Sequence, residues 1–284
     1  MQEMEGQLFV GERALFQSEN LRVSNSTFTD GESPLKESRN IRLIHTVFGW
    51  KYPLWYAKGI QMSDSALLET ARAGIWYTDD VTASNTVIDA PKTFRRSKKI
   101  TLDHVQLSNA VETLWHCENV SLNHVTAKGD YFAMNSRNVT ADDFRLSGNY
   151  SFDGARDVEI HNATLLSRDA FWNCENVTVR DSLIVGEYLG WNSRNLTFVD
   201  CTIESLQGLC YIENLTLKNC RLQNTTLAFE YSTVDADIAS GIDSVTNPRG
   251  GSIRARSIGE LIMDETKVDP SNTTITLTET AHAA

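Results

Sequence analysis

The stretch Cys174–Ile184, with the sequence CENVTVRDSLI, decides the fold of this 284-residue chain because the chain repeats it. It returns nineteen residues later as SRNLTFVDCTI at Ser193–Ile203, and after nineteen more as IENLTLKNCRL at Ile212–Leu222. A fixed period of this length is typical of solenoids, in which one structural unit is stacked many times. We therefore analyse the chain as columns, each made of the equivalent positions in successive repeats.

Column zero holds the first aliphatic residue of each repeat, which is Val177 in the opening stretch. Apolar residues recur at positions zero and plus two, and a second pair of strand positions, plus five and plus seven, follows a two-residue polar turn. This period-two alternation indicates short strands separated by corners. The clear members of column zero are Leu21, Ile41, Ile60, Val81, Ile100, Val120, Val139, Val158, Val177, Leu196 and Leu215.

Polar residues fill two corner columns, one immediately before column zero and one at plus four. Asn176 and Asp181 are the examples in the opening stretch, and most other repeats also carry Asn, Asp or His there. Asn and Asp tolerate left-handed backbone and suit tight corners, and their side chains can form ladders along a stack of coils. A third corner with glycines such as Gly186 precedes a further predicted strand, seen in Tyr188–Asn192.

These columns predict an all-β fold, a single right-handed parallel β-helix with about 19 residues per coil and end caps. Caps are expected because open strand edges invite further pairing. We assign residues 1–17 to an N-terminal cap and residues 18–223 to about eleven coils. Residues 224–284 are expected to form degenerate coils and a C-terminal cap of the same domain.

The composition excludes several classes of function. A formal net charge of −11 offers no basic stripe for a phosphate backbone, so no nucleic-acid partner is expected. The same charge disfavours unaided binding of a polyanionic sugar. No apolar run is long enough to span a membrane, and Met1–Glu5 lacks the features of a signal peptide. Five cysteines without metal-ligand spacing fit a cytoplasmic protein, for which we expect no metal and no cofactor.

Several phrases that differ from the repeat carry a family resemblance. The chain resembles an uncharacterised bacterial family, a domain of unknown function in the pectin-lyase-like superfamily of right-handed parallel β-helices. The resemblance extends over nearly the whole chain and implies the fold, but no established activity. The phrases are Gly11–Phe16, Gly31–Ser38, Ala71–Tyr77, Ala90–Ser97, Gly129–Phe132, Asn149–Gly154, Ala170–Cys174 and Leu227–Tyr231.

Two columns on the third predicted strand, four and eight residues before column zero, are polar or amphipathic. Both are expected to face outward, one strand period apart. Tyrosine rings stack on sugar faces, and amides and acids hydrogen-bond to sugar hydroxyls. The columns therefore predict a carbohydrate-binding or carbohydrate-modifying ridge. Its substrate-binding candidates are Arg96, Glu112, His116, Tyr131, Asn135, Tyr150, Asn173, Tyr188 and Asn192.

A neighbouring column, five residues before column zero, is rich in tryptophan. We expect these rings to stack inside the coil or at its edge, and the pattern leaves open which side they face. Arg95 and Asp153 interrupt the column, and a charge among apolar residues needs a partner or access to water. Asp153 is therefore the first candidate for a functional acid. The tryptophans are Trp55, Trp76, Trp115, Trp172 and Trp191.

The sequence leaves open whether the protein is an enzyme. A glycosidase needs two carboxylates roughly 5–10 Å apart, and Asp130, Asp153 and Asp169 could supply such a catalytic pair across adjacent coils. The motifs expected of a polygalacturonase-like enzyme, Asn-Thr-Asp, Gly-His and Arg-Ile-Lys, do not occur. The alternative is a non-enzymatic scaffold or interaction module, whose aromatic ridge binds a protein partner or a second copy in a homo-oligomer.

The histidines and cysteines have structural interpretations. His45, His104 and His124 occupy the plus-four corner column, so we interpret them as corner residues and not as ligands. Cys201 and Cys220 share column plus five on adjacent coils, which is close enough for a disulfide. In a reducing compartment we expect two buried thiols that pack as small apolar side chains.

Overall fold

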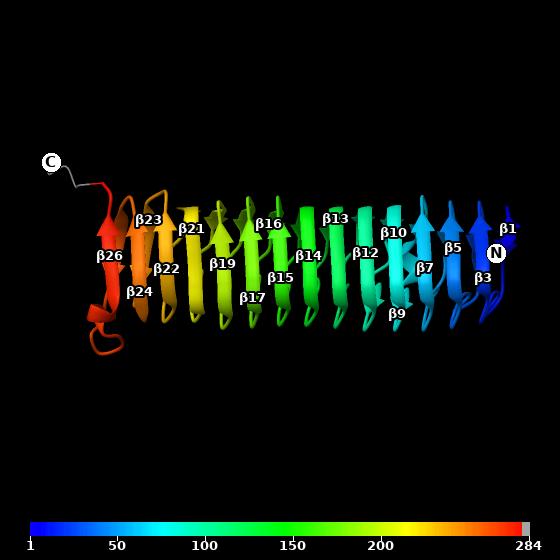
Figure 1. Cartoon of the computed structure of the whole chain (residues 1–284), viewed down its shortest axis with the longest axis horizontal. Coiled ribbons are helices and arrows are strands. Elements are labelled where there is room, and N and C mark those ends of the chain that lie inside the picture. The colour runs from blue at the N-terminus through cyan, green and yellow to red at the C-terminus, as the bar shows by residue number, and fades with distance from the viewer. Residues whose placement is uncertain (280–284) are drawn as a thin grey trace. The chain divides into compact units, whose positions relative to one another are not determined.

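Parallel pairing between strands of successive coils makes the chain an all-β solenoid of about 15 turns with about 19 residues per turn. The computed structural model describes residues 1–279 and divides into two compact units, Met1–Ser147 and Gly148–Ala284. In each unit the strands follow one another in chain order (Figure 1). The predicted all-β fold of parallel coils is confirmed, while its right-handed sense stays a prediction. The end of the predicted C-terminal cap, 280–284, lies outside the described residues.

The first unit contains most of the long strands. β10, β12, β13 and β14 each run through two sides of a coil without interruption. Its elements are β1 (Gln2–Glu5), β2 (Leu8–Phe9), β3 (Glu19–Ser24), β4 (Thr27–Phe28), β5 (Arg39–Ile44), β6 (Val47–Phe48), β7 (Lys58–Ser63), β8 (Ala66–Leu67), the short helix η1 (Glu69–Ala71), β9 (Ile75–Trp76), β10 (Asp79–Ile88), β11 (Phe94–Arg95), β12 (Lys98–Leu107), β13 (Glu118–Lys128) and β14 (Arg137–Ser147).

The second unit has shorter strands and ends in a second short helix and a final strand. Among residues 1–279, no helix is long and apolar enough to cross a bilayer. The elements of this unit are β15 (Arg156–His161), β16 (Thr164–Leu166), β17 (Glu175–Arg180), β18 (Leu183–Val185), β19 (Arg194–Val199), β20 (Thr202–Glu204), β21 (Glu213–Gln223), β22 (Thr233–Ile238), β23 (Ile242–Thr246), β24 (Gly250–Ala255), β25 (Ile258–Ile262), η2 (Pro270–Asn272) and β26 (Thr273–Leu277).

The strand register follows column zero. Val177 in β17 lies opposite Leu196 in β19, and both side chains are buried. The same ladder extends beyond the eleven predicted coils, because Gln2 of β1 lies opposite Leu21 and Thr273 of β26 lies opposite Gly251. Residues 1–17, assigned from the sequence to a cap, thus contain strands in the register of the coils. The domain boundaries stay a prediction.

Both corner columns adopt the left-handed backbone that the sequence predicts. Asn176 has φ of 58° and Asp181 has φ of 50°. The side chains also form the expected ladders: Asn176 donates to Asp157 at 2.8 Å, and Asn195 donates to Asn176 at 2.8 Å. The corners are therefore joined along the solenoid axis by side chains as well as by backbone.

The third side of each coil, such as Tyr131–Asn135, differs from the third strand that the sequence predicts. In most coils it is a turn in which alternate residues are left-handed, for example Tyr131, Ala133 and Asn135 with φ of 58°, 58° and 54°. Strand geometry is confined to short pieces, such as β9 and β11. Hydrogen bonds to adjacent coils hold this costly backbone in place, as in Ala133 N–H to the Thr113 carbonyl at 2.9 Å.

The interior is apolar, but it contains buried hydroxyls at fixed columns. Ser97, three residues before column zero, is fully buried. Its Oγ accepts a hydrogen bond from the Thr78 N–H at 3.0 Å and donates to the Ile75 carbonyl at 3.1 Å. Ser193 makes the equivalent pair in the second unit, with Cys174 at 2.8 Å and Phe171 at 2.7 Å. These hydroxyls supply hydrogen-bond partners for backbone N–H and C=O groups at the point where the third side meets the next strand.

Replacing this buried hydroxyl should destabilise the coil stack. We expect Ser97→Ala to lower the free energy of unfolding by about 1–3 kcal/mol, because it leaves the buried Thr78 N–H without its acceptor. Urea denaturation followed by circular dichroism measures the loss. Ser147→Ala, at an exposed position of β14, is the matched control and should change the stability by less than about 0.5 kcal/mol. Equal effects of the two variants would contradict the role of the buried hydroxyl.

All five cysteines are buried thiols. Burial raises the pKa of Cys117 and of Cys210 to about 12 in each case. The hydrogen bond to Cys220, together with burial, also raises the pKa of Cys201. Cys201 Sγ lies 3.4 Å from the Val179 carbonyl oxygen, and Cys220 Sγ lies 3.4 Å from that of Phe198. The predicted packing of these two thiols inside the coils is confirmed.

These thiols should be unreactive in the folded protein. All five sulfur atoms are buried and out of reach of a water-soluble reagent. The pKa values of Cys117, Cys174, Cys201 and Cys210 are also raised, so these four thiols stay protonated at pH 8, and the thiolate is the reactive form. We expect Ellman's reagent to detect almost no thiol in the native protein and five per chain in 6 M guanidinium chloride. Rapid labelling of one or more cysteines under native conditions would contradict the buried arrangement.

Candidate functional site

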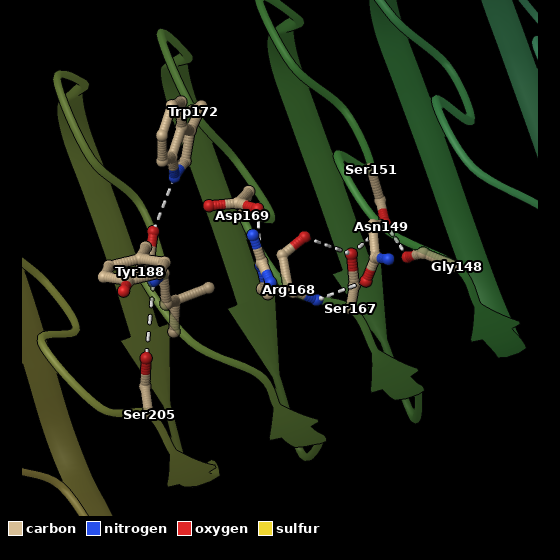
Figure 2. A network of polar contacts seen from close by, with 10 residues as sticks. Gly148, Asn149, Ser151, Ser167, Arg168, Asp169, Trp172, Tyr188 and Ser205 are labelled. Atoms are coloured by element: carbon tan, nitrogen blue, oxygen red, sulfur yellow. Dashed lines mark hydrogen bonds and ion pairs between the residues drawn. The ribbon is translucent and has the colours of Figure 1, made fainter.

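The tryptophan column lies at the outer edge of the third side, half-buried, next to buried core residues such as Phe171. Each of the five rings donates its indole N–H to a backbone carbonyl of the next coil. Trp172 donates to Tyr188 at 2.7 Å (Figure 2), and Trp191 donates to Gln207 at 2.6 Å. The rings of Trp172 and Trp191 stack with centroids 5.9 Å apart. The expected stacking at the coil edge is confirmed.

Arg95 occupies the same column in the first unit, where the rings of two tryptophans lie on either side of its guanidinium. Its guanidinium carbon lies 4.5 Å from the ring centroids of both Trp76 and Trp115. Its Nη2 atom also donates to Glu112 Oε2 at 3.0 Å. Glu112 pairs in addition with Lys92 at 3.1 Å. The guanidinium charge that interrupts this aromatic column is therefore paired with Glu112 and lies between two rings, although the buried Arg95 Nε has no hydrogen-bond partner among the described residues.

Removing this guanidinium should cost more stability than removing its neighbour. We expect Arg95→Met to lower the free energy of unfolding by about 1–2 kcal/mol, through loss of the two cation–π contacts and of one charged hydrogen bond. Arg96→Met, one residue along on the exposed side, should change it by less than about 0.5 kcal/mol. Thermal and urea denaturation of both variants measure the difference. A loss for Arg96→Met as large as for Arg95→Met would contradict this account.

The predicted ridge tyrosines pack against the tryptophans and form one aromatic wall with them. Tyr150 meets Trp172 edge to face at 6.2 Å between centroids, and Tyr188 meets Trp191 at 5.3 Å. Tyr131 is placed in the same way beside a tryptophan of the first unit. The aromatic residues of the columns five and eight residues before column zero thus pack together in each unit, whereas other members of the second column, such as Asp169, are buried.

The column four residues before column zero carries an amide ladder in the second unit. Asn192 donates to Asn173 at 2.8 Å, and Asn173 donates to Asp153 at 2.8 Å. In the first unit, the predicted residues of this column, Arg96, His116 and Asn135, are exposed. Partial burial and then the positive charges of Arg96 and Arg95 lower the pKa of His116.

A groove of about 520 Å³ opens beside this amide ladder in the second unit. Of the nine substrate-binding candidates, Asn173 and Asn192 line it, and the other seven are not among its lining residues. Aromatic, amide and charged side chains share the lining. The groove residues are Arg156, Asn173, Cys174, Glu175, Asn192, Ser193, Arg194, Tyr211, Ile212, Glu213, Tyr231 and Arg249.

Alternating charges form one wall of the groove, two residues before column zero. Glu175 pairs with Arg156 at 3.6 Å and with Arg194 at 2.7 Å. The hydrogen bond from Arg194 lowers the pKa of Glu175, and the same contact raises the pKa of Arg194. Glu213 follows on the next coil. These side chains offer charged donors and acceptors in fixed positions.

The end of the groove comes from a break in the repeat. The coil that starts at Val234 is short, because Gly251 already lies opposite Val234, seventeen residues on. The chain therefore crosses early at Asn247–Arg249, where Asn247 accepts from the Tyr231 N–H at 3.0 Å. Arg249 is exposed there and lines the groove.

The charged residues of the groove are not among the candidates predicted from the sequence. The signal was present for four of them, because Arg156, Glu175, Arg194 and Glu213 recur every nineteen residues with alternating charge. The nineteen-residue spacing could not identify Arg249, because this residue comes after the coil has shortened to seventeen residues.

The three catalytic candidates are not among the groove residues. Asp169 is buried and pairs with Arg168, whose Nε lies 3.1 Å from Asp169 Oδ2 (Figure 2). Asp153 is half-buried and accepts from Asn173, and Asp130 is an exposed residue of the first unit. The structure therefore gives Asp153 and Asp169 separate partners. A catalytic role of Asp130, Asp153 and Asp169 stays a prediction.

Three solved structures are similar to this chain at low identity. The surface adhesin PfbA of Streptococcus pneumoniae is 12% identical with a TM-score of 0.43, over 79% of this chain and 71% of its own. The A-module of the mannuronan C-5 epimerase AlgE4 of Azotobacter vinelandii is 10% identical with a TM-score of 0.35, over 98% and 87%. An exopolygalacturonase of Thermotoga maritima is 8% identical with a TM-score of 0.35, over 96% and 84%.

No curated protein matches this sequence. One family model does, over residues 2–276, and its description is "Protein of unknown function (DUF3737)". This match confirms the resemblance to an uncharacterised family that the sequence phrases indicated. The chain belongs to the DUF3737 family of proteins of unknown function.

Proposed function

We propose that this protein binds a carbohydrate chain along the third side of its second unit. The observation that carries the proposal is a continuous aromatic track that leads into the groove. Trp172, Trp191, Tyr211 and Tyr231 follow one another on successive coils, with ring centroids 5.9, 5.1 and 5.5 Å apart. The last two rings also line the groove.

The chemistry beside this track suits sugars. Aromatic faces and edges offer apolar contact to sugar rings, and amides donate to and accept from hydroxyls. Asn173 and Asn192 place such amides at the groove in a fixed ladder. A groove of about 520 Å³ is within the size range of small-molecule binding sites.

The charges of the groove favour a carbohydrate chain that is neutral or carries few carboxylates. Glu175 is shared between Arg156 and Arg194, so much of the positive charge is already neutralised. Arg249, at the end of the groove, could receive one carboxylate of a sugar. A carbohydrate chain with a carboxylate on every sugar would be repelled by the net charge of −11 of the whole protein.

Binding is favoured over hydrolysis. A general acid must hold a proton near neutral pH, whereas the ion pair with Arg194 lowers the pKa of Glu175. Asp153 and Asp169 are engaged with Asn173 and Arg168. The proposal therefore covers recognition of the chain and no cleavage step.

Truncation of a groove tyrosine should weaken sugar binding. Once a glycan array identifies a bound oligosaccharide, we expect Tyr211→Ala to raise its Kd at least tenfold in calorimetry, because the aromatic contact at the groove is lost. Tyr77→Ala is the matched control. It occupies the same column, is similarly exposed (38% against 41% for Tyr211), stacks on Tyr56 and belongs to the first unit. Its Kd should stay within about twofold of the wild-type value.

Two outcomes would contradict the proposal. The first is no binding to a broad panel of neutral and acidic oligosaccharides. The second is full affinity in Tyr211→Ala. If light scattering instead shows a homo-oligomer that Tyr211→Ala dissociates, the track is a self-association surface.

A further inference from the structure

Two corner histidines of the first unit lie side by side. β12 pairs in parallel with β13, with Asp103 opposite Asn123, so His104 and His124 follow at the same corner of adjacent coils. Both have left-handed backbone, with φ of 53° and 50°, and their rings stack with centroids 4.4 Å apart. Their side chains are about half exposed.

A carboxylate joins these two rings. Asp103 Oδ1 lies 3.0 Å from His104 Nδ1 and 3.9 Å from His124 Nδ1. Asn123 donates to the same oxygen at 2.7 Å and holds the carboxylate at the corner. One oxygen and two imidazole nitrogens, all within 4.8 Å of one another, therefore gather at one exposed point.

We propose that Asp103, His104 and His124 form a binding site for a divalent transition-metal ion, principally Zn²⁺. Zinc bonds to nitrogen and carboxylate oxygen are about 2.0–2.2 Å long, so tetrahedral ligand atoms are roughly 3.3–3.5 Å apart. The distances of 3.0 and 3.9 Å from Asp103 Oδ1 bracket this value. Imidazole ligands favour zinc, copper and nickel over calcium and magnesium.

Ion binding requires one local adjustment. The planes of the two rings are only 16° apart, so the nitrogen lone pairs of the two rings lie in nearly parallel planes. Rotation of one ring about its terminal side-chain torsion would turn its Nδ1 atom toward an ion held by the other two groups, and both side chains are about half exposed. Asp143 Oδ2, 3.6 Å from His124 Nε2, is placed to orient that ring from its other nitrogen.

The site would link two neighbouring coils and leave a coordination position for water or a ligand group, as three protein ligands do for zinc. The expectation of no metal treats each histidine as the corner residue of its own coil. The signal for a shared site in the sequence is the presence of two histidines in one column on consecutive coils. This inference involves the first unit alone and is independent of the proposed groove function.

Calorimetric titration of the full, tag-free chain with ZnCl₂ tests the site. We expect one saturable equivalent, and a Kd at least tenfold higher in the double variant His104→Asn/His124→Asn. Asparagine is a native residue of this corner column, as at Asn85, so the backbone conformation should be kept. His45→Asn is the matched control: it removes a corner histidine whose neighbours in the column are Asn25 and Asp64, and it should leave zinc binding unchanged.

Calcium or magnesium in millimolar excess should not displace the zinc. The proposal is overturned if the wild-type chain shows no saturable zinc binding, or if the double variant binds zinc as tightly as the wild type. Circular dichroism and thermal denaturation in EDTA establish that the variants are folded, so that lost binding reports lost ligands.

Discussion

Backbone hydrogen bonding between coils is the constraint on which the rest of this structure depends. Strands on the first two sides of a coil exchange N–H and C=O groups with the coils above and below, in a parallel register of about 19 residues. A register that is kept from coil to coil places equivalent residues roughly 4.8 Å apart along the axis. Residues far apart in the chain thereby become neighbours in columns, and each column repeats one type of contact.

The corners show what this register demands of the backbone. A closed coil of about 19 residues must turn sharply several times, and left-handed residues make these turns. Asn and Asp adopt that conformation at small cost, which explains the two polar corner columns. On the third side, however, larger residues such as Tyr131 and Phe152 are also left-handed. Only the combined hydrogen bonding of neighbouring coils makes that backbone acceptable.

The column arrangement also explains how the surface features arise. A single exposed tyrosine or asparagine binds a ligand weakly, but the repeat multiplies it into a track or a ladder. Trp191 and Tyr211 line up because they stand on successive coils, and the groove ends where the repeat shortens before Arg249. The same spacing brings His104 and His124 into contact at a corner whose other members are mostly Asn and Asp.

The sequence by itself determined the columns of the first two sides: which residues are buried there, which turn corners and which equivalent residues lie on adjacent coils. It could do so because a nineteen-residue period equals one coil, so spacing along the chain translates directly into position in space. The tertiary structure decided the backbone conformations and side-chain orientations that the nineteen-residue period does not specify. It replaced the predicted third strand by alternating left-handed turns, since backbone conformation there depends on bonds to adjacent coils. It also decided the partner of Arg95, the position of Arg249 and the approach of Asp103 to two histidines, because side-chain orientation depends on several coils at once.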